Sequence, residues 1–259
     1  MLRGFYTAGS GMITYQNRLN VHGNNLANVS TAGFKKDGLI AGTFGEHVAV
    51  RMNAYQGTNA AEIGRGVFIT TTVDEFTDHS QGAFDSTGRS LDLSVVGPGY
   101  FVLNNAQGQF LTRDGQFALD DEGYLVLPGY GRVQGESGDI ELGTSAFLVS
   151  SDGTISVEDE DGELEEVDRF FIAMPAEGSE IKKMHNGELF AVDAFVQLEA
   201  DEDTEPTRVL QGILERSNVD VAHEMSAIIA TQRGFQSCSQ ILKMYDEMAD
   251  QANTRITRV

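Results

Sequence analysis

The chain has 259 residues, of which 41% are hydrophobic, so it can bury a core in one or two domains. Its formal net charge of −21 argues against binding to nucleic acid or to an anionic membrane surface, because both would repel it at long range. The single cysteine, Cys238, cannot form an internal disulfide, and no apolar run approaches the roughly 20 residues that span a bilayer.

The first predicted element is an N-terminal helix with apolar residues every seven positions. Phe5, Met12, Leu19 and Leu26 have this spacing, with Ala8 and Tyr15 between them. Such a narrow apolar stripe is typical of a coiled-coil-like contact rather than of a broad core-facing surface. An unusual run of neutral amides, NVHGNNLANVSTAGFKK at residues 20–36, follows the last full turns of this stripe.

The middle of the chain changes to a period of two, with turn signals between short apolar runs. Ile155 and Val157 alternate, and so do the apolar residues from Phe190 to Leu198. This pattern predicts half-buried antiparallel strands. The turn signals are Asn104-Asn105, Asp114-Gly115, Glu122-Gly123, Asp152-Gly153, Asp161-Gly162 and Asn186-Gly187.

The last predicted element is a helix of about ten turns, from roughly Val219 to beyond Ala252. The segment Ser217-Asn218-Val219-Asp220 offers several N-cap candidates before it. The residues predicted to make helix contacts at the two ends of the chain are Phe5, Met12, Tyr15, Leu19, Asn24, Asn25, Leu26, Asn28, Val221, Met225, Ile228, Phe235, Leu242, Tyr245 and Ala249.

The sequence therefore predicts an α+β fold in which long N- and C-terminal helices pair as a coiled-coil-like stalk and an antiparallel β-rich body lies in the middle. The alternative is that both helices fold back onto the body as ordinary cover. The expected domains are a terminal helical domain of residues 1–36 plus 217–259, a connecting segment of residues 37–80 plus 206–216, and a β-rich outer domain of residues 81–205.

Charge is concentrated in the middle of the chain. Eighteen of the 39 acidic residues lie between Asp152 and Glu205, whereas residues 1–36 hold four basic residues and no acid. Copies could therefore pack their ends together while the acidic middles stay solvated, although an acidic surface that only confers solubility explains the same pattern.

Several stretches together resemble the flagellar axial proteins of bacteria, the family of rod and hook subunits. The N-terminal match is GFYTAGSGM followed by NNLANVSTAGFKK, and the C-terminal match is GILERSNVDVAHEMSAIIATQRGFQSCSQILKMYDEM. The β-region matches, in order, are EIGRGVFI, QGAFDSTGRSLDLSVVGPGYFVL and FLTRDGQFALDDEGYLVLPGYGRVQG. Chain length and motifs are similar to those of basal-body rod proteins, proximal or distal, rather than to the longer hook subunit. Pro98, Phe235 and Ser237 depart from the family pattern.

The resemblance implies a non-enzymatic building block of the basal body. Copies would stack helically with each other and with other rod and hook subunits into a hollow shaft that transmits torque from motor to hook. The terminal helices would form the inner tube. The chain would leave the cell unfolded through the flagellar export apparatus without a cleaved signal peptide, which agrees with the absence of a signal-like start and of disulfides.

Within such a tube, the amides have two possible roles. Asn24 and Asn28 lie four residues apart with Asn25 beside them, so they could bond across neighbouring helices without burying charge. Alternatively, they only cap a fraying helix in solvent. Gly33 would end the helix in a left-handed cap.

Signals for catalysis, metals and cofactors are weak, and we expect none of these sites, nor a small-molecule substrate. His223-Glu224-Met225-Ser226-Ala227 starts like a zinc-protease helix, but Ala227 stands where the second histidine would be needed. The alternative function is a secreted β-rich protein that binds or hydrolyses glycans and is oligomerised by its terminal helices.

Overall fold

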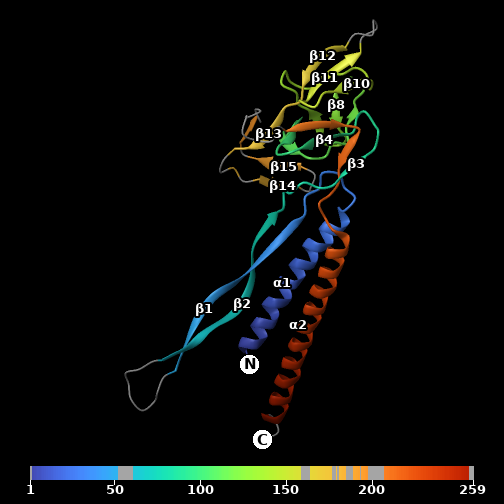
Figure 1. The fold of residues 1–259 in the computed structure, drawn as a ribbon. Helices are drawn as coiled ribbons and strands as arrows, with labels where there is room; N and C mark the ends of the chain where they lie inside the picture. The colour runs from blue at the N-terminus through green and yellow to red at the C-terminus, as the bar shows by residue number, and fades with distance from the viewer. Residues whose placement is uncertain are drawn as a thin grey trace. The chain divides into compact units, whose positions relative to one another are not determined.

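The fold is described from a computed structural model and is α+β, as the sequence predicts, with a helix near each end and antiparallel strands between them (Figure 1). The structure describes residues 2–51, 61–158, 164–176, 179, 181–184, 189–192, 194–197 and 207–256. The predicted turns at Asp161-Gly162 and Asn186-Gly187 lie outside these residues.

The chain forms two compact units. The helical unit consists of Met1–Ala27, Asp37–Asp78 and Asp220–Val259, and the β body consists of Asn28–Lys36 and His79–Val219. These limits differ from the expected domain limits, because residues 28–36 belong to the β body and the hairpin that follows belongs with the helices. The division into inner, connecting and outer domains of an assembly stays a prediction.

The helical unit contains α1 (Leu2–Ala27) and α2 (Val221–Ile256). The 36 residues of α2 make ten turns, close to the predicted length. Asp220 is the N-cap among the four candidates, since its carboxylate accepts hydrogen bonds from the N–H groups of Ala222 and His223. No helix among the described residues is long and apolar enough to cross a membrane.

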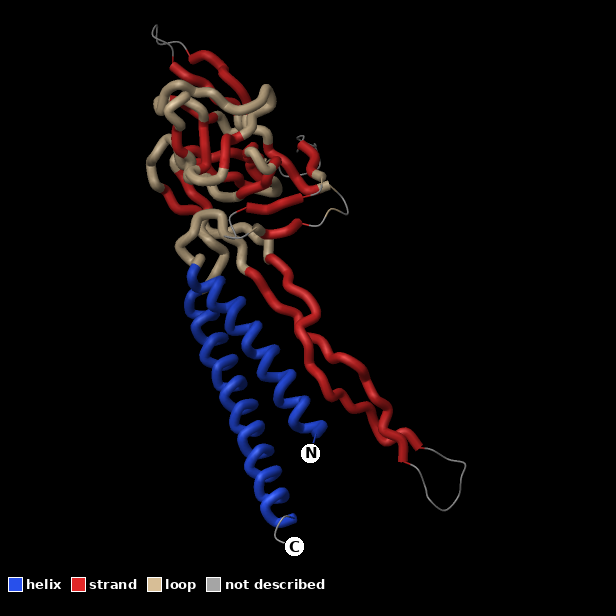
Figure 2. Tube along the Cα trace, turned by 180° about the vertical axis from the view of Figure 1, so that it is seen from behind, coloured by secondary structure: helices blue, strands red, loops and turns tan. Residues whose placement is uncertain are grey.

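The two helices lie side by side and antiparallel (Figure 2). Three close approaches define their register: Gly4 faces Tyr245, Gly11 faces Cys238, and Gly234 faces Tyr15. A Cβ atom on Gly234 would stand 2.7 Å from the Tyr15 ring. Glycine at these positions therefore allows a large side chain of the partner helix to lie against the backbone.

The segment expected to be a connection forms a long hairpin of β1 (Asp37–Arg51) and β2 (Ala61–Thr77). The strands are antiparallel, with Asp37 opposite Thr77 and Arg51 opposite Ala61. A two-stranded ribbon is marginal in water on its own. Contacts of both strands with α1 make the hairpin part of the helical unit.

The β body contains one large sheet and three small ones. The strands of the large sheet run in the order β14-β15-β6-β5-β9-β8-β7, with β13 pairing both β5 and β16, while β10-β11-β12 form a second sheet. Two further pairs, β3 with β18 and β4 with β17, join the first strands of the body to its last. The strands are β3 (Phe84–Ser86), β4 (Leu93–Val96), β5 (Tyr100–Asn105), β6 (Gly108–Thr112), β7 (Ala118–Leu119), β8 (Leu125–Leu127), β9 (Gly131–Val133), β10 (Phe147–Val149), β11 (Thr154–Glu158), β12 (Leu164–Arg169), β13 (Ile172–Pro175), β14 (Ile181–Lys183), β15 (Leu189–Val192), β16 (Phe195–Gln197), β17 (Arg208–Gln211) and β18 (Ile213–Glu215).

The two alternating patterns in the sequence both lie in antiparallel strands. The alternation of Ile155 and Val157 lies in β11, with Ile155 fully buried, as expected. The described residues of the run from Phe190 to Leu198 lie in two antiparallel strands, since β15 pairs with β6 and β14 whereas β16 pairs with β13, and Leu198 lies outside the described residues. Period-two alternation indicates which face of a strand is buried. In this run the alternation extends over two strands that pair with different partners.

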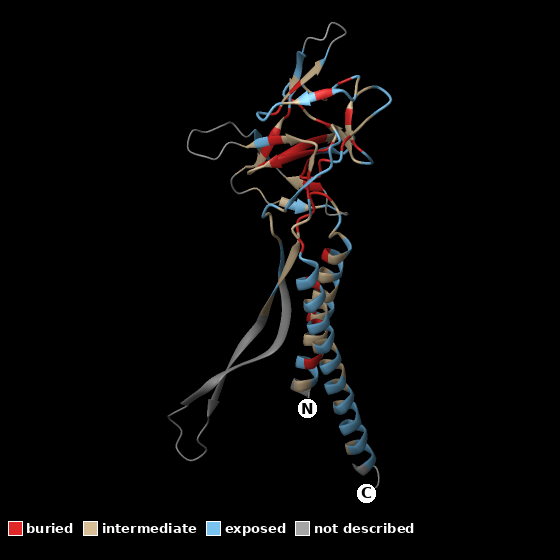
Figure 3. Cartoon of the chain, turned by 45° about the vertical axis from the view of Figure 1, so that its right-hand side comes forward, coloured by how far each residue is buried: buried red, intermediate tan, exposed pale blue. Residues whose placement is uncertain are grey.

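The core lies in the β body (Figure 3). At its centre, the ring of Phe101 packs edge to face against Phe117 and Phe170, with centroid distances of 5.1 Å and 5.6 Å respectively. By contrast, most described side chains of α1 and α2 are exposed or half-buried. The helices therefore keep apolar surface that the chain itself does not cover.

Candidate assembly surface and charged cluster

The predicted heptad positions divide between half-buried and exposed residues of α1 and α2. Met12, Tyr15, Leu19 and Leu26 are half-buried in α1, and Ile228, Phe235, Leu242 and Tyr245 are half-buried in α2. The remaining predicted apolar positions, Phe5, Val221, Met225 and Ala249, are exposed. That these positions make the helix contacts stays a prediction.

A polar pair occupies this contact face near the start of α2. His22 Nδ1 lies 2.6 Å from Glu224 Oε2, and the Glu224 side chain is only 6% exposed. The buried acid interrupts the apolar face at the level where Val221 and Met225 turn outward. A buried polar pair of this kind favours one register of two helices over the alternatives.

Large apolar side chains remain exposed along both helices. Met225 is 52% exposed and Met244 is 54% exposed, although both are on a helix whose other face is packed. Further exposed apolar side chains of the two helices are Phe5, Tyr6, Ile13, Val221, Ile229, Ile241 and Met248. Exposed apolar surface is a feature of sites of protein–protein contact.

The three predicted asparagines differ in their surroundings. Asn25 is fully buried, and both ends of its amide bond to the backbone of Asp37, which donates to Oδ1 at 2.9 Å and accepts from Nδ2 at 2.8 Å. Asn25 therefore joins the end of α1 to the first residue of β1. Asn24 is exposed and Asn28 is half-buried. Neither interpretation of those two amides, contact across helices or solvent capping, is tested by the structure.

Gly33 adopts the expected left-handed conformation, with φ of 66°, but it does not cap α1. The helix ends six residues earlier, at Ala27, and Gly33 belongs to the β body. Its N–H donates to the carbonyl of Glu215, and a Cβ atom would stand 2.3 Å from the Arg113 backbone. The glycine is needed because another part of the β body approaches its backbone closely.

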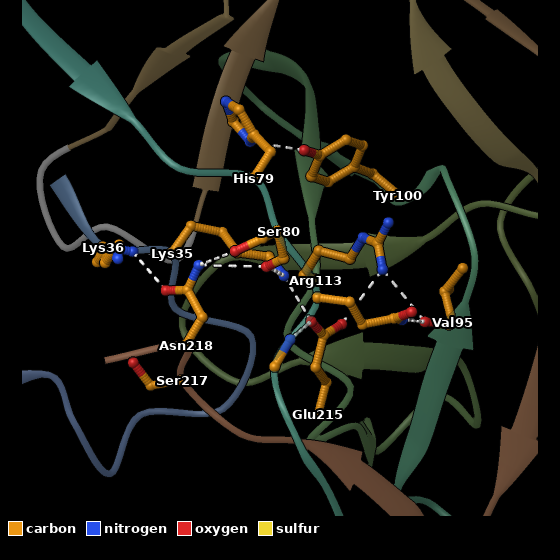
Figure 4. Close-up of polar contacts among 12 residues, drawn as sticks. Lys35, Lys36, His79, Ser80, Val95, Tyr100, Arg113, Glu215, Ser217 and Asn218 are labelled. Atoms are coloured by element: carbon orange, nitrogen blue, oxygen red, sulfur yellow. Dashed lines mark hydrogen bonds and ion pairs between the residues drawn. The ribbon is translucent and has the colours of Figure 1, made fainter. Parts of the chain in front are cut away.

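Next to Gly33, three charged side chains are buried together in the β body (Figure 4). The charged cluster consists of Lys35, Arg113 and Glu215, whose side chains are 1%, 5% and 0% exposed. Lys35 Nζ lies 2.5 Å from Glu215 Oε1, and Arg113 lies 3.2 Å from Glu215 Oε2. One carboxylate therefore accepts from both cations, which is the condition under which charges are tolerated in a core.

Backbone groups add further hydrogen bonds to the cluster, while the buried Nε of Arg113 has no partner among the described residues. Lys35 also donates to the carbonyl of Ser80, and Arg113 donates to the carbonyls of Val95 and Gly97. The N–H of Gly82 donates to Glu215. The cluster thus connects residues near 35, 80, 95, 113 and 215, which are far apart in the sequence.

Asn218 makes a second set of connections beside the cluster. Its side-chain oxygen accepts from the N–H of Lys36 at 2.7 Å, and its amide nitrogen donates to Ser80. Asn218 was considered from sequence only as a candidate N-cap of the last helix. Its observed role is to hold together the three segments of the β body that adjoin the helical unit in the sequence.

An aromatic hydroxyl lies near Arg113. Tyr100 is 6% exposed, and its hydroxyl is 2.7 Å from Nδ1 of His79. Burial raises the pKa of Tyr100 above its usual value. Two smaller effects act on the same pKa: the charge of Arg113 lowers it, and the charge of Glu215 raises it. The phenol is therefore held neutral inside the body.

Sequence reasoning missed the charged cluster, although its members stand in motifs already noted. Lys35 is in GFKK, Arg113 is in FLTRDG and Glu215 is in GILERSN. Lys35 and Glu215 each follow a large apolar residue, Phe34 and Leu214, whereas Arg113 stands between Thr112 and Asp114. Nothing in one sequence indicates that the three motifs meet, because Arg113 is 102 residues and Lys35 is 180 residues away from Glu215.

Comparisons with known proteins place these motifs in one family. The model described as "Flagella basal body rod protein" matches residues 5–35, and "Flagellar basal body rod FlgEFG protein C-terminal" matches residues 210–255. "Flagellar hook protein FlgE/F/G D1 domain" matches residues 94–157. The matched regions include Lys35, Arg113 and Glu215.

Relatives match over nearly the full chain. The basal-body rod protein FlgG of Bacillus subtilis is 37% identical, with 96% of this chain and 97% of the relative covered. FlgG of Borreliella burgdorferi is 31% identical, with 98% of both chains covered. The hook protein FlgE of Treponema pallidum is 40% identical, but the match covers 52% of this chain and 30% of the hook protein.

These relatives are structural proteins, and nothing in the comparisons supports a glycan-directed activity. The three family models match an N-terminal, a middle and a C-terminal part of the chain. The chain therefore belongs to the flagellar basal-body rod protein family and is a structural subunit of the basal body, not an enzyme.

Proposed function

We propose that copies of this subunit assemble helically through the helical unit into the hollow rod that carries torque from motor to hook and lets export substrates pass. In this proposal the terminal helices form the inner-tube part, pair as a coiled coil and bind neighbouring copies, while the β body forms the outer part. The observation that carries the proposal is the apolar surface left open on α1 and α2, from Tyr6 at 62% exposure to Met244 at 54%.

The contact between α1 and α2 supports the coiled-coil proposal. Gly4 with Tyr245 and Gly11 with Cys238 are separated by seven residues on both helices. A seven-residue step that repeats on two antiparallel helices keeps the same faces in contact over several turns. Helices of this length that pack on only one side gain further stability when neighbouring copies cover the other sides.

Neighbouring subunits in the proposal include other rod proteins and the hook. The 40% identity to a hook protein over 143 residues supports this part of the proposal. We also propose that the chain reaches the rod through the flagellar export apparatus without a cleaved signal. The free thiol of Cys238 fits this route, since no disulfide in the described chain would resist threading.

The assembly proposal is tested with single charges placed on the open helix faces. Met225→Glu and Met244→Glu should prevent incorporation into the rod, because a carboxylate would be buried in the subunit contact. Gln232→Glu adds the same charge at an exposed polar position of α2 and serves as the control. Rod content is measured by electron microscopy of purified basal bodies, and monomer folding by circular dichroism.

We expect folded monomers for all three variants, with normal rods only for Gln232→Glu. Normal rods and swimming in cells carrying Met225→Glu and Met244→Glu would refute the assigned surface. The double variant Asn24→Ala/Asn28→Ala separately tests the amides, and rods of unchanged register and stability would exclude a role in subunit contacts.

A further inference from the structure

The first strands of the β body pair with its last strands. β3 and β4 follow one another near the start of the body, and each is hydrogen-bonded in a two-stranded sheet with β18 or β17 from its end. β4 is central to the core, since Leu93, Ser94 and Val95 are at most 1% exposed. The segment Arg208–Glu215 therefore supplies the pairing partner of a core strand that lies more than a hundred residues earlier in the sequence.

The charged cluster has the same dependence on the last strands. The segment Arg208–Glu215, here called the closing segment, follows Lys35 and Arg113 in the sequence. Glu215, the acid paired with both cations, is the last residue of β18 and of this segment. Burial of a cation without its counter-charge is strongly unfavourable. Before the closing segment docks, the body would have to bury two cations that lack this carboxylate.

We propose that Arg208–Glu215 is a closing segment that gates folding of the β body, with Glu215 as the counter-ion that permits Lys35 and Arg113 to enter the core. Pairing over such sequence separations is slow, because the entropy of loop closure is lost before the contacts form. The body therefore stays open until the closing segment arrives. This inference rests on the proposed export of the chain, for which an open body can be threaded and a closed one cannot.

The order of folding can be measured on the full chain by pulse-labelled amide exchange during refolding. We expect amides of β5 and β6, the central pair of the large sheet, to become protected in the same kinetic phase as amides of β4 and β17. Protection of β5 and β6 in an earlier phase would overturn the proposal, because the sheet would then form without the closing segment.

Glu215→Gln tests the role of the carboxylate while keeping the size of the side chain. We expect exchange protection to fall by about a hundredfold at β5, β6 and β17 together, since one buried partner of an ion cluster is lost. Glu122→Gln removes an exposed partner of Arg132 in the same body and should leave protection within about threefold. Loss of protection confined to β17 and β18 would contradict the gate.

If Glu215→Gln does not fold at all, the refolding measurement on the unchanged chain still decides the order. Both measurements use the isolated subunit. They can therefore fail while the assembly test on α2 succeeds, so the failure of this inference and of the proposed function are distinguishable.

Discussion

At the scale of single residues, Asn25 shows how a poor helix former can be retained. Its amide exchanges two hydrogen bonds with the backbone of Asp37, so it continues the bonding of the chain past the end of α1. The sequence drew attention to the amide, but the partner it suggested was a neighbouring helix. The hydrogen bonds with Asp37 were not predictable, because they depend on the path of residues 28–36, which returns residue 37 to the end of the helix.

Asn25→Ala should lower the free energy of unfolding by about 1–3 kcal/mol, because it removes the two hydrogen bonds between the buried amide and the backbone of Asp37. The amide proton of Asp37 should also exchange faster. Urea unfolding and amide exchange measure these effects. Asn24→Ala is the matched control, an exposed asparagine in the same turn, and should change stability by less than about 0.5 kcal/mol. Equal losses for both variants would refute the assigned role of Asn25.

Tyr100 gives a pH-dependent prediction. Because burial raises its pKa in the folded chain, the stability linked to this group is fully present below about pH 10, the usual value, and is lost as pH rises through the folded pKa. Tyr100→Phe should therefore make the alkaline fall in unfolding free energy shallower. Urea unfolding from pH 8 to 11 checks the slope, with exposed Tyr6→Phe as the control. An unchanged slope in Tyr100→Phe would contradict burial of the phenol.

At the scale of elements, the long helices were the most predictable part of the chain. Heptad spacing persists over ten turns of α2, and such a long signal identifies the element. The β1–β2 hairpin was missed for the opposite reason. Its residues carry few turn signals of the kind that mark the short hairpins of the body, and a two-stranded ribbon has no core to impose a strong alternation.

Two glycines of the helical unit should respond in opposite directions to alanine. Gly234→Ala places a methyl group against the ring of Tyr15 and should destabilise by about 1–3 kcal/mol. Gly9→Ala meets nothing within 4 Å and should stabilise α1 by up to about 1 kcal/mol, because alanine is the better helix former. Thermal unfolding of the two variants measures the difference. A similar gain in both would show that the helices do not approach closely at Gly234.

At the scale of the whole molecule, the sequence predicted the two terminal helices and the β-rich middle but placed the border of the body incorrectly around Lys35. The helix pattern stops near Leu26, and nothing local shows that the following residues are core residues of a different unit. Phe34 and Lys35 are at most 1% exposed only because distant segments of the β body cover them. Such contacts become visible only in three dimensions.

A pair of truncated chains follows from this border. A chain of residues 28–219 keeps the whole β body and should retain its amide-exchange protection. A chain of residues 37–219 lacks Lys35 and leaves Glu215 short of one cation, so it should be less stable by about 3–5 kcal/mol. Urea unfolding compares the two. Equal stability would mean that residues 28–36 are not part of the folded body.

The register of the helices also fixes where α2 stands alone. Because Gly4 is level with Tyr245, the first residues of α1 reach only to about Glu247, while α2 continues to Ile256. The end that projects past α1 is roughly 13 Å long at 1.5 Å per residue. Residues added or deleted after Glu247 would therefore change the reach of the tip while keeping the register that Gly4 and Tyr245 define.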